Sequence, residues 1–239
     1  MIDVRAMKSI EIDPVARTAR VGAGCTWGEF DAAAQVHGLA TTGGRVSTTG
    51  VSVLTLGGGS GWLERKHALS CDNLVAVELV TAVGRELRAD DQQHPELLWA
   101  CKGGGGNFGV VTAMEFKLHP VGPLILGGLL AWPADRGPEV ARRYRDMASE
   151  APAEFGSALV MLSGPPEEFV PPHLQGQPIV AVALMWTGDE AAGTDVVRVL
   201  RDLGPEIDLV GPMPYAQMQS MLDDPPGFRQ YWSAERGLP

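Results

Sequence analysis

Two glycine-rich segments in the first half of the chain carry the residues best suited to chemistry. The first runs from Gly43 to Trp62, where hydroxyl and apolar β-branched side chains separate two glycine clusters. Glycines let backbone N–H groups approach a flat or anionic ligand, and turns at positive φ direct successive N–H groups toward a pyrophosphate or the polar edge of a heterocycle. The segment therefore predicts a cofactor-binding loop, although glycine clusters also form ordinary turns and bulges.

The second segment, Gly103–Gly109, contains the letters of a dinucleotide fingerprint at Gly104, Gly106 and Gly109. That fingerprint requires a strand before it and a helix after it. Here residues 95–101 predict a helix and residues 110–118 predict a strand, so the order is reversed. The sequence therefore argues against a Rossmann domain.

Composition limits the classes of protein and of partner. The chain has 239 residues, 45% hydrophobic and 20% charged, which suffices for one large core or two smaller ones. A net charge of −10 and a pI near 4.9 disfavour a nucleic-acid partner. No apolar run reaches the roughly 20 residues of a membrane span, and charged residues interrupt any signal peptide at the start. We expect a cytoplasmic protein with no membrane segment.

Other catalytic classes have little support in the sequence. Cys25, Cys71 and Cys101 are odd in number and lack C-x-x-C spacing, so reduced structural thiols are expected. The five histidines have no metal-ligand spacing, and no G-x-S-x-G nucleophile elbow is present. We therefore expect neither a metal site nor a hydrolytic nucleophile.

The elements that must position the glycine segments follow from local patterns. Alternation predicts a hairpin from residues 9–13 and 18–22. Thr26 and Glu29 form a capping-box pattern at the start of a helix, for which Gly38 suits the C′ position. Residues 74–80 predict a strand that returns around Gly84 as residues 85–88, and residues 110–118 predict the next strand.

A new pattern begins after Val121-Gly122-Pro123, the best candidate for a domain boundary. Strands are predicted over residues 124–132, 155–163, 178–186 and 207–212, and helices over 135–151 and 189–203. This β-α-β-β-α-β order permits an antiparallel sheet with both helices on one face, which gives an α+β fold class. The proline-rich residues 164–172 predict a surface loop or a mobile wall over a pocket. Residues 228–232 predict an aromatic strand.

The ordered set of segments resembles a known family. Residues 38–40, 43–62, 65–69, 71–74, 103–111 and 209–215 are similar to the berberine bridge enzyme-like flavoproteins, within the vanillyl-alcohol oxidase and p-cresol methylhydroxylase type of FAD-linked oxidases. The resemblance implies that residues 1–121 are the second part of an FAD-binding domain with mixed or antiparallel strands. It implies that residues 122–239 are part of a substrate domain, whose antiparallel sheet covers the flavin ring.

The resemblance also implies which residues contact FAD. The segment from Gly44 to Gly61 would follow the flavin ring and the pyrophosphate, with Ser47, Thr48 and Ser60 as hydrogen-bonding side chains. Val110 would lie at the adenine end. The implied cofactor-binding residues are Gly44, Val46, Ser47, Thr48, Gly50, Gly58, Gly59, Ser60, Gly61 and Val110.

Three departures from the family pattern bear on function. No segment of the sequence resembles the family's N-terminal subdomain, which binds the pyrophosphate and supplies a flavin-linked histidine. Val46 stands where some members carry a flavin-linking cysteine, so the expected FAD is non-covalent. The chain is also expected to end before the catalytic base, which leaves that residue unknown; Tyr231 and Trp232 align with a strand facing the substrate, or simply pack in the sheet.

Two classes of function follow. The first is part of an FAD-dependent oxidoreductase that transfers a hydride from a small molecule (a sugar, an alcohol or a secondary metabolite) to flavin. The chain would be either a fragment of that enzyme or a protein whose missing half comes from another chain. The alternative is a non-catalytic remnant or interaction module that exposes an apolar surface and self-associates. A weak, non-covalent flavin binder lies between these two.

Overall fold

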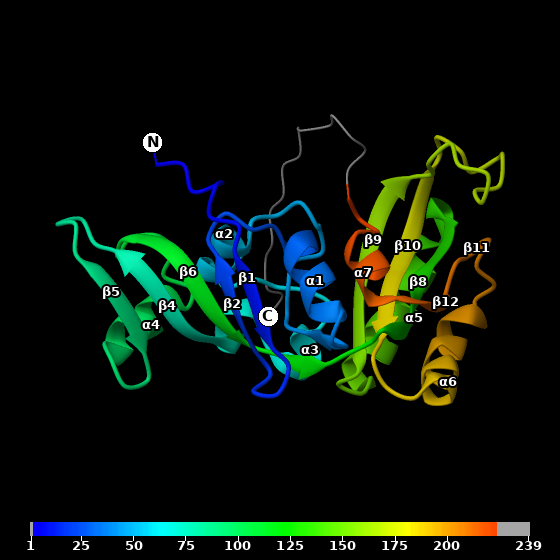
Figure 1. Cartoon of the computed structure of the whole chain (residues 1–239). Helices are drawn as coiled ribbons and strands as arrows, with labels where there is room; N and C mark the ends of the chain where they lie inside the picture. Colours follow the sequence, from blue (N-terminus) through cyan, green and yellow to red (C-terminus); the bar gives the residue numbers. More distant parts are fainter. Residues whose placement is uncertain (1, 224–239) are drawn as a thin grey trace.

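The computed structural model describes residues 2–223, which form two antiparallel sheets lying side by side (Figure 1). Helices α1 (Trp27–Gln35) and α7 (Tyr215–Gln219) pack against one another between the sheets. This arrangement confirms the α+β class expected from the sequence.

The first sheet has five strands and a core on one of its faces. Its order is β1 (Ile10–Asp13), β2 (Thr18–Gly22), β6 (Val110–Lys117), β4 (Leu74–Val80) and β5 (Glu86–Asp90). Helices α1 and α4 (Pro95–Cys101) contribute to the same buried cluster. Within it, the rings of Trp27, Phe30 and Phe116 lie 5.4–6.0 Å apart between centroids. The predicted hairpin is confirmed, as is the reversed order of helix, glycine segment and strand.

The second sheet realises the predicted β-α-β-β-α-β order. Its strands are β11 (Ile207–Asp208), β8 (Leu124–Pro133), β10 (Pro178–Trp186) and β9 (Phe155–Ser163), and β12 (Gly211–Pro214) also pairs with β8. Because side chains alternate along a strand, β10 serves two cores. Val182 and Leu184 pack with α5 (Gly137–Glu150) and α6 (Glu190–Arg201), whereas Ala183 and Met185 pack with Trp62 of the first glycine segment.

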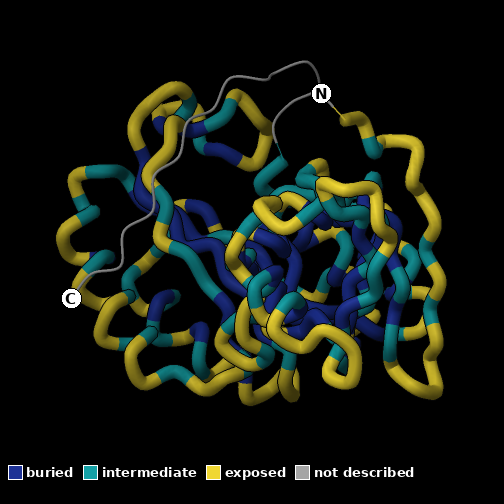
Figure 2. The backbone as a smooth tube through the Cα atoms, turned by 90° about the vertical axis from the view of Figure 1, so that its left-hand side faces the viewer, coloured by how far each residue is buried: buried dark blue, intermediate teal, exposed yellow. Residues whose placement is uncertain are grey.

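Short elements complete the described chain. The strands β3 (Leu39–Ala40) and β7 (His119–Pro120) pair with each other. The short helices are α2 (Val51–Leu56), α3 (Glu64–His67) and two 3-10 turns at Ser70–Asn73 and Ala134–Arg136. The buried residues lie along the segments inside the molecule, and the exposed residues lie mostly in the outer connections (Figure 2). Among residues 2–223, no helix has the length and apolar character of a membrane span.

Three expectations about elements require correction. The first glycine segment is not a continuous loop, because its middle forms α2, whose Val51, Ser52, Thr55 and Leu56 are buried. The strand expected over 207–212 is split into β11 and β12, since the Asp208 carboxylate accepts the Val210 N–H at 3.0 Å.

The proline-rich residues 164–172 lie mostly on the surface, as predicted, and Val170 among them is buried against the second sheet. Helix α1 ends at Gln35, and Gly38, at φ +64°, ends the turn that follows. The predicted aromatic strand at 228–232, with Tyr231 and Trp232, lies outside the described residues.

Candidate cofactor-binding site

The two ends of the first glycine segment meet in space. A Cβ atom on Gly61 would lie 1.7 Å from the Gly43 carbonyl oxygen, so the two backbones are in direct contact. Gly58 and Gly59 have φ of +109° and +83°, which L side chains rarely adopt. The N–H of Gly105 donates to the Leu56 carbonyl at 2.8 Å, which attaches the second glycine segment to the end of α2. The tertiary structure therefore brings both glycine segments together.

Several backbone N–H groups of this region have no hydrogen-bond acceptor in the described part of the protein. Within residues 2–223, the N–H groups of Gly44, Val46, Thr48, Gly59 and Ser60 have no hydrogen-bond acceptor. All five belong to the set predicted to contact FAD. Backbone N–H groups without a protein partner need water or a ligand as acceptor. An acceptor-rich ligand such as a flavin or a pyrophosphate suits a segment with this many backbone donors without an acceptor.

Arg45 joins the two halves of the segment. Its Nη1 donates to Ser60 Oγ at 2.9 Å, and its Nη2 lies 3.1 Å from Glu64 Oε1. Glu64 also accepts the Gly61 N–H at 3.0 Å, and the Arg45 guanidinium lies 5.3 Å from the centroid of the Trp62 ring. Arg45 Nε and Trp62 Nε1 are buried and have no partner among the described residues. These orphaned donors, together with the glycine cradle, fit an acceptor-rich cofactor.

Ser47 is held differently from the other predicted residues. Its N–H donates to Asp223 Oδ1 at 2.7 Å, and its Oγ donates to Asp223 Oδ2 at 2.5 Å. Its carbonyl accepts the Gly28 N–H at 2.8 Å. Both Ser47 donors are therefore engaged, and only the lone pairs of its hydroxyl remain for a ligand.

The remaining predicted residues occupy separate positions. Gly50 precedes α2 and pairs with Thr26 in an isolated β-bridge. Val46 is half-buried within the segment. Val110 begins β6 opposite Val80, on the first sheet. Its place at the adenine end stays a prediction.

A buried polar cluster lies beside the segment, where α1 meets α7. Gln219 Nε2 donates to Asp31 Oδ2 at 2.9 Å and to the Gly44 carbonyl at 3.3 Å. Burial raises the pKa of Asp31 to about 7, and burial together with the Asp31 charge raises the pKa of the Tyr215 hydroxyl. Asp31 occupies the apolar face of α1 between Trp27 and Ala34, and an acidic residue at that position is a signal that sequence reasoning did not use.

Sequence reasoning also missed Arg45, Glu64, Gln219 and Asp223. Arg45 and Glu64 flank predicted residues, but their types gave no reason to expect contact. Gln219 lies 175 residues from Gly44, and Asp223 lies 176 residues from Ser47, in the chain. No local pattern encodes a contact over that separation.

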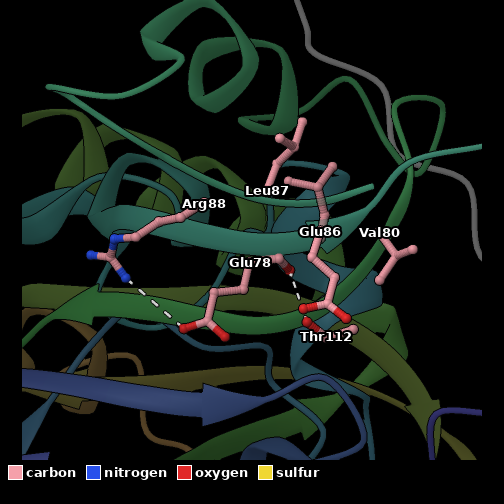
Figure 3. A pocket seen from close by; sticks show the side chains of 7 residues that line it. Glu78, Val80, Glu86, Leu87, Arg88 and Thr112 are labelled. Atoms are coloured by element: carbon pink, nitrogen blue, oxygen red, sulfur yellow. Dashed lines mark hydrogen bonds and ion pairs between the residues drawn. The ribbon is translucent and has the colours of Figure 1, made fainter. Parts of the chain in front are cut away.

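A pocket of about 410 Å³ lies on the polar face of the first sheet, away from the core (Figure 3). Its lining residues include Glu78, Arg88 and Thr112. Two of its charged residues are engaged in ion pairs: Glu78 with Arg20 at 2.7 Å, and Arg88 with both Asp90 and Glu115. Glu86 also lines the pocket and has no ion pair within residues 2–223. The bond from Arg20 holds the pKa of Glu78 below its ordinary value. This pocket is a paired surface network and leaves few groups to act on a ligand.

Comparison with known proteins agrees with the geometry of the glycine segments. Residues 1–90 match the family model described as FAD binding domain. An FAD-linked oxidoreductase of Dictyostelium discoideum is 34% identical over 97% of this chain and 49% of its own length. The chain is a homologue of the FAD-linked oxidoreductases, with an FAD binding domain over residues 1–90. FAD is the cofactor of the family, and this chain spans about half the length of that relative.

Solved structures place the fold in the same family. The 6-hydroxy-D-nicotine oxidase of Arthrobacter nicotinovorans matches with a TM-score of 0.81 and 30% identity, over 92% of this chain and 47% of the oxidase. A berberine bridge enzyme variant matches with a TM-score of 0.79 and 24% identity, over 93% of this chain and 44% of the enzyme. The second likeness concerns the fold alone. Both agree with the resemblance seen in the sequence.

Proposed function

We propose that this chain supplies the flavin-facing part of an FAD-dependent oxidoreductase, which transfers a hydride from a small molecule to a non-covalently bound FAD. The proposal rests on the N–H groups of Gly44, Val46, Thr48, Gly59 and Ser60, which have no acceptor within residues 2–223. Bound FAD would supply the two-electron acceptor, and the protein would position it. Val46 supports non-covalent binding, since a valine cannot form a thioether.

The same proposal assigns a role to each half of the chain. Residues 1–121 would bind FAD, and residues 122–239 would contribute to the substrate site. The substrate class stays a sugar, an alcohol or a secondary metabolite. The free, buried Cys25, Cys71 and Cys101 support a cytoplasmic location, where thiols stay reduced.

Absorption of the purified chain tests FAD binding directly. After incubation with FAD and desalting, we expect a retained flavin spectrum, and we expect acid precipitation to release the flavin into the supernatant. Thr48→Ala and Ser60→Ala should each weaken FAD binding by about 2- to 10-fold, as expected for one hydrogen bond. Thr194→Ala, on the exposed face of α6, should leave the affinity unchanged. A chain that never retains flavin would contradict the proposal.

A second candidate is an interaction module, which exposed apolar side chains favour. Val53 on α2 and Trp99 on α4 are each 78% exposed, and both helices adjoin glycine segments. A further folded unit or a second copy of the chain could cover them. Light scattering tests this candidate: self-association that Trp99→Gln abolishes would support it, and a monomer that retains FAD would oppose it.

A further inference from the structure

Residues that follow the second sheet contact the first glycine segment at two points. Gln219, 1% exposed, donates to the Gly44 carbonyl at 3.3 Å. Four residues later, Asp223 accepts both the N–H and the hydroxyl of Ser47, at 2.7 and 2.5 Å. The stretch Gly44–Ser47 is therefore held from one side by α7 and by the residues after it.

We propose that Gln219 and Asp223 are positioning residues that fix the FAD-binding shape of Gly44–Ser47. The inference rests on the proposed function, because it concerns the same cofactor segment. It makes the affinity of that segment for FAD depend on contacts made by the far end of the described chain.

The geometry assigns the two residues to positioning rather than to contact with a ligand. Gln219 ends α7 and is buried against α1, where its amide nitrogen donates to Asp31 and to the Gly44 carbonyl. The Asp223 carboxylate takes up both donors of Ser47, so the Ser47 hydroxyl can only accept a bond from a donor on the ligand. A flavin ring or a ribityl chain offers such a donor.

The held stretch has other fixed points as well, because the Arg45 side chain bonds to Ser60 and Glu64 and the Val46 carbonyl accepts the Thr49 N–H at 3.2 Å. The Ser47 carbonyl accepts one bond from Gly28 in α1. Within residues 2–223, the N–H groups of Gly44 and Val46 bond to no protein group. Loss of the Asp223 carboxylate would remove two of the bonds that define the backbone at Ser47, and the segment would sample more conformations before FAD binds.

Two matched pairs of variants test the inference. Asp223→Asn keeps the side-chain volume but loses one acceptor oxygen, and Gln219→Leu removes the amide. Asp202→Asn and Gln217→Leu, both at exposed positions, serve as controls. Titration with FAD, followed by quenching of flavin fluorescence, should show about 10-fold weaker binding for the first pair, because hydrogen bonds to charged or buried groups are the stronger ones. The controls should match the wild-type chain.

Amide hydrogen exchange of the FAD-free chain gives a readout that does not depend on FAD. Within residues 44–49, the hydrogen-bonded amides are those of Ser47, to Asp223, and of Thr49, to the Val46 carbonyl. These two amides should exchange faster in Asp223→Asn and Gln219→Leu, while β10 keeps its wild-type protection. If either variant fails to fold, Ser47→Ala, which removes only one bond to Asp223, should give a smaller increase in exchange.

Unchanged exchange at 44–49, or tighter FAD binding by Asp223→Asn, would overturn the inference; the latter would show that Asp223 competes with FAD. If the wild-type chain binds no FAD, the proposed function fails, and the exchange data still decide whether the two residues hold the segment.

Discussion

Gly61 illustrates, at the scale of single residues, why the cofactor segment contains so many glycines. The carbonyl of Gly43 occupies the space that its side chain would need, at 1.7 Å from an ideal Cβ position. Gly50, in the same segment, has open space around its Cβ position and a φ of −68°. The glycines of one segment therefore differ in how strictly the fold requires them.

Gly61→Ala is expected to destabilise the chain by several kcal/mol or to prevent folding, since neither backbone can give way without disrupting the contact. Gly50→Ala should change the free energy of unfolding by less than about 1 kcal/mol, the scale of a cap substitution. Urea denaturation followed by tryptophan fluorescence measures both. Equal stabilities for the two variants would contradict the close contact.

Asp31 should make stability fall as the pH rises. Its pKa is about 7 in the folded chain and about 3.9 in an unfolded one. Between these values the folded state binds more protons, so the free energy of unfolding decreases from pH 4 to pH 7, by at most about 1.4 kcal/mol per pH unit. Asp31→Asn should remove this decrease and be more stable than wild type at pH 8. Asp202→Asn should keep the wild-type pH profile.

His67 should make the free energy of unfolding fall as the pH decreases, over part of the same pH range. Burial, with the neighbouring His119 and lysine charges, lowers its pKa to about 4, and its ring stacks on His119 at 3.7 Å. The unfolded chain therefore binds more protons below about pH 6.5, and stability from this group is lost as the pH falls toward 4. His67→Phe, which keeps a stacked ring, should be less sensitive to acid in thermal melts at pH 4.5 and 7. An unchanged acid sensitivity would exclude His67 as its source.

At the scale of elements, the capping box of α1 is confirmed in both of its bonds. The Thr26 hydroxyl accepts the Glu29 N–H, and the Glu29 carboxylate accepts the Thr26 N–H at 2.7 Å. Thr26 also pairs with Gly50 in the β-bridge before α2. The start of α1 is thus tied to the cofactor segment.

Thr26→Ala should lower the free energy of unfolding by about 1 kcal/mol, because an N–H at the helix start loses its acceptor. Thr26→Ser keeps the hydroxyl and should recover most of that loss. Chemical denaturation followed by circular dichroism measures both variants. If serine fails to rescue, the methyl group rather than the cap accounts for the effect.

At the scale of the whole molecule, short connections join the two sheets. Arg65 of α3 donates to the carbonyls of Ala148 and Ala151 at the end of α5, at 2.6 and 2.9 Å. Lys66 lies 3.2 Å from Glu154, and Trp62 packs with Ala183 and Met185 of β10. The carbonyl of Trp62 also approaches Gly156 of β9, where a Cβ would lie 2.1 Å away. The second sheet therefore rests on residues just after the cofactor segment.

Arg65→Ala should lower the free energy of unfolding by about 1 kcal/mol, because the two carbonyls at the end of α5 lose their cationic donor. The loss is small because Arg65 is exposed to solvent. Arg142→Ala, at an exposed site on α5, should change stability by less than about 0.5 kcal/mol. Thermal unfolding compares the two. A junction that contributes nothing would give both variants the same midpoint.

The amino-acid sequence by itself determined the strands, the long helices, the cap at Thr26 and the helix-glycine-strand order that argued against a Rossmann domain. These features depend on side-chain periodicity and on hydrogen bonds between residues a few positions apart, which the sequence displays directly. It also placed the glycine segments and, through resemblance, their cofactor.

Only the tertiary structure decided which residues surround the glycine segments. Helix α2 forms in a stretch of β-branched and hydroxyl residues because burial of one face outweighs their weak helix propensity. Gln219 bonds to both Asp31 and Gly44, and Asp223 bonds to Ser47, because the two sheets pack around α1 and α7. Such contacts depend on the path of the whole chain, and no local pattern specifies that path.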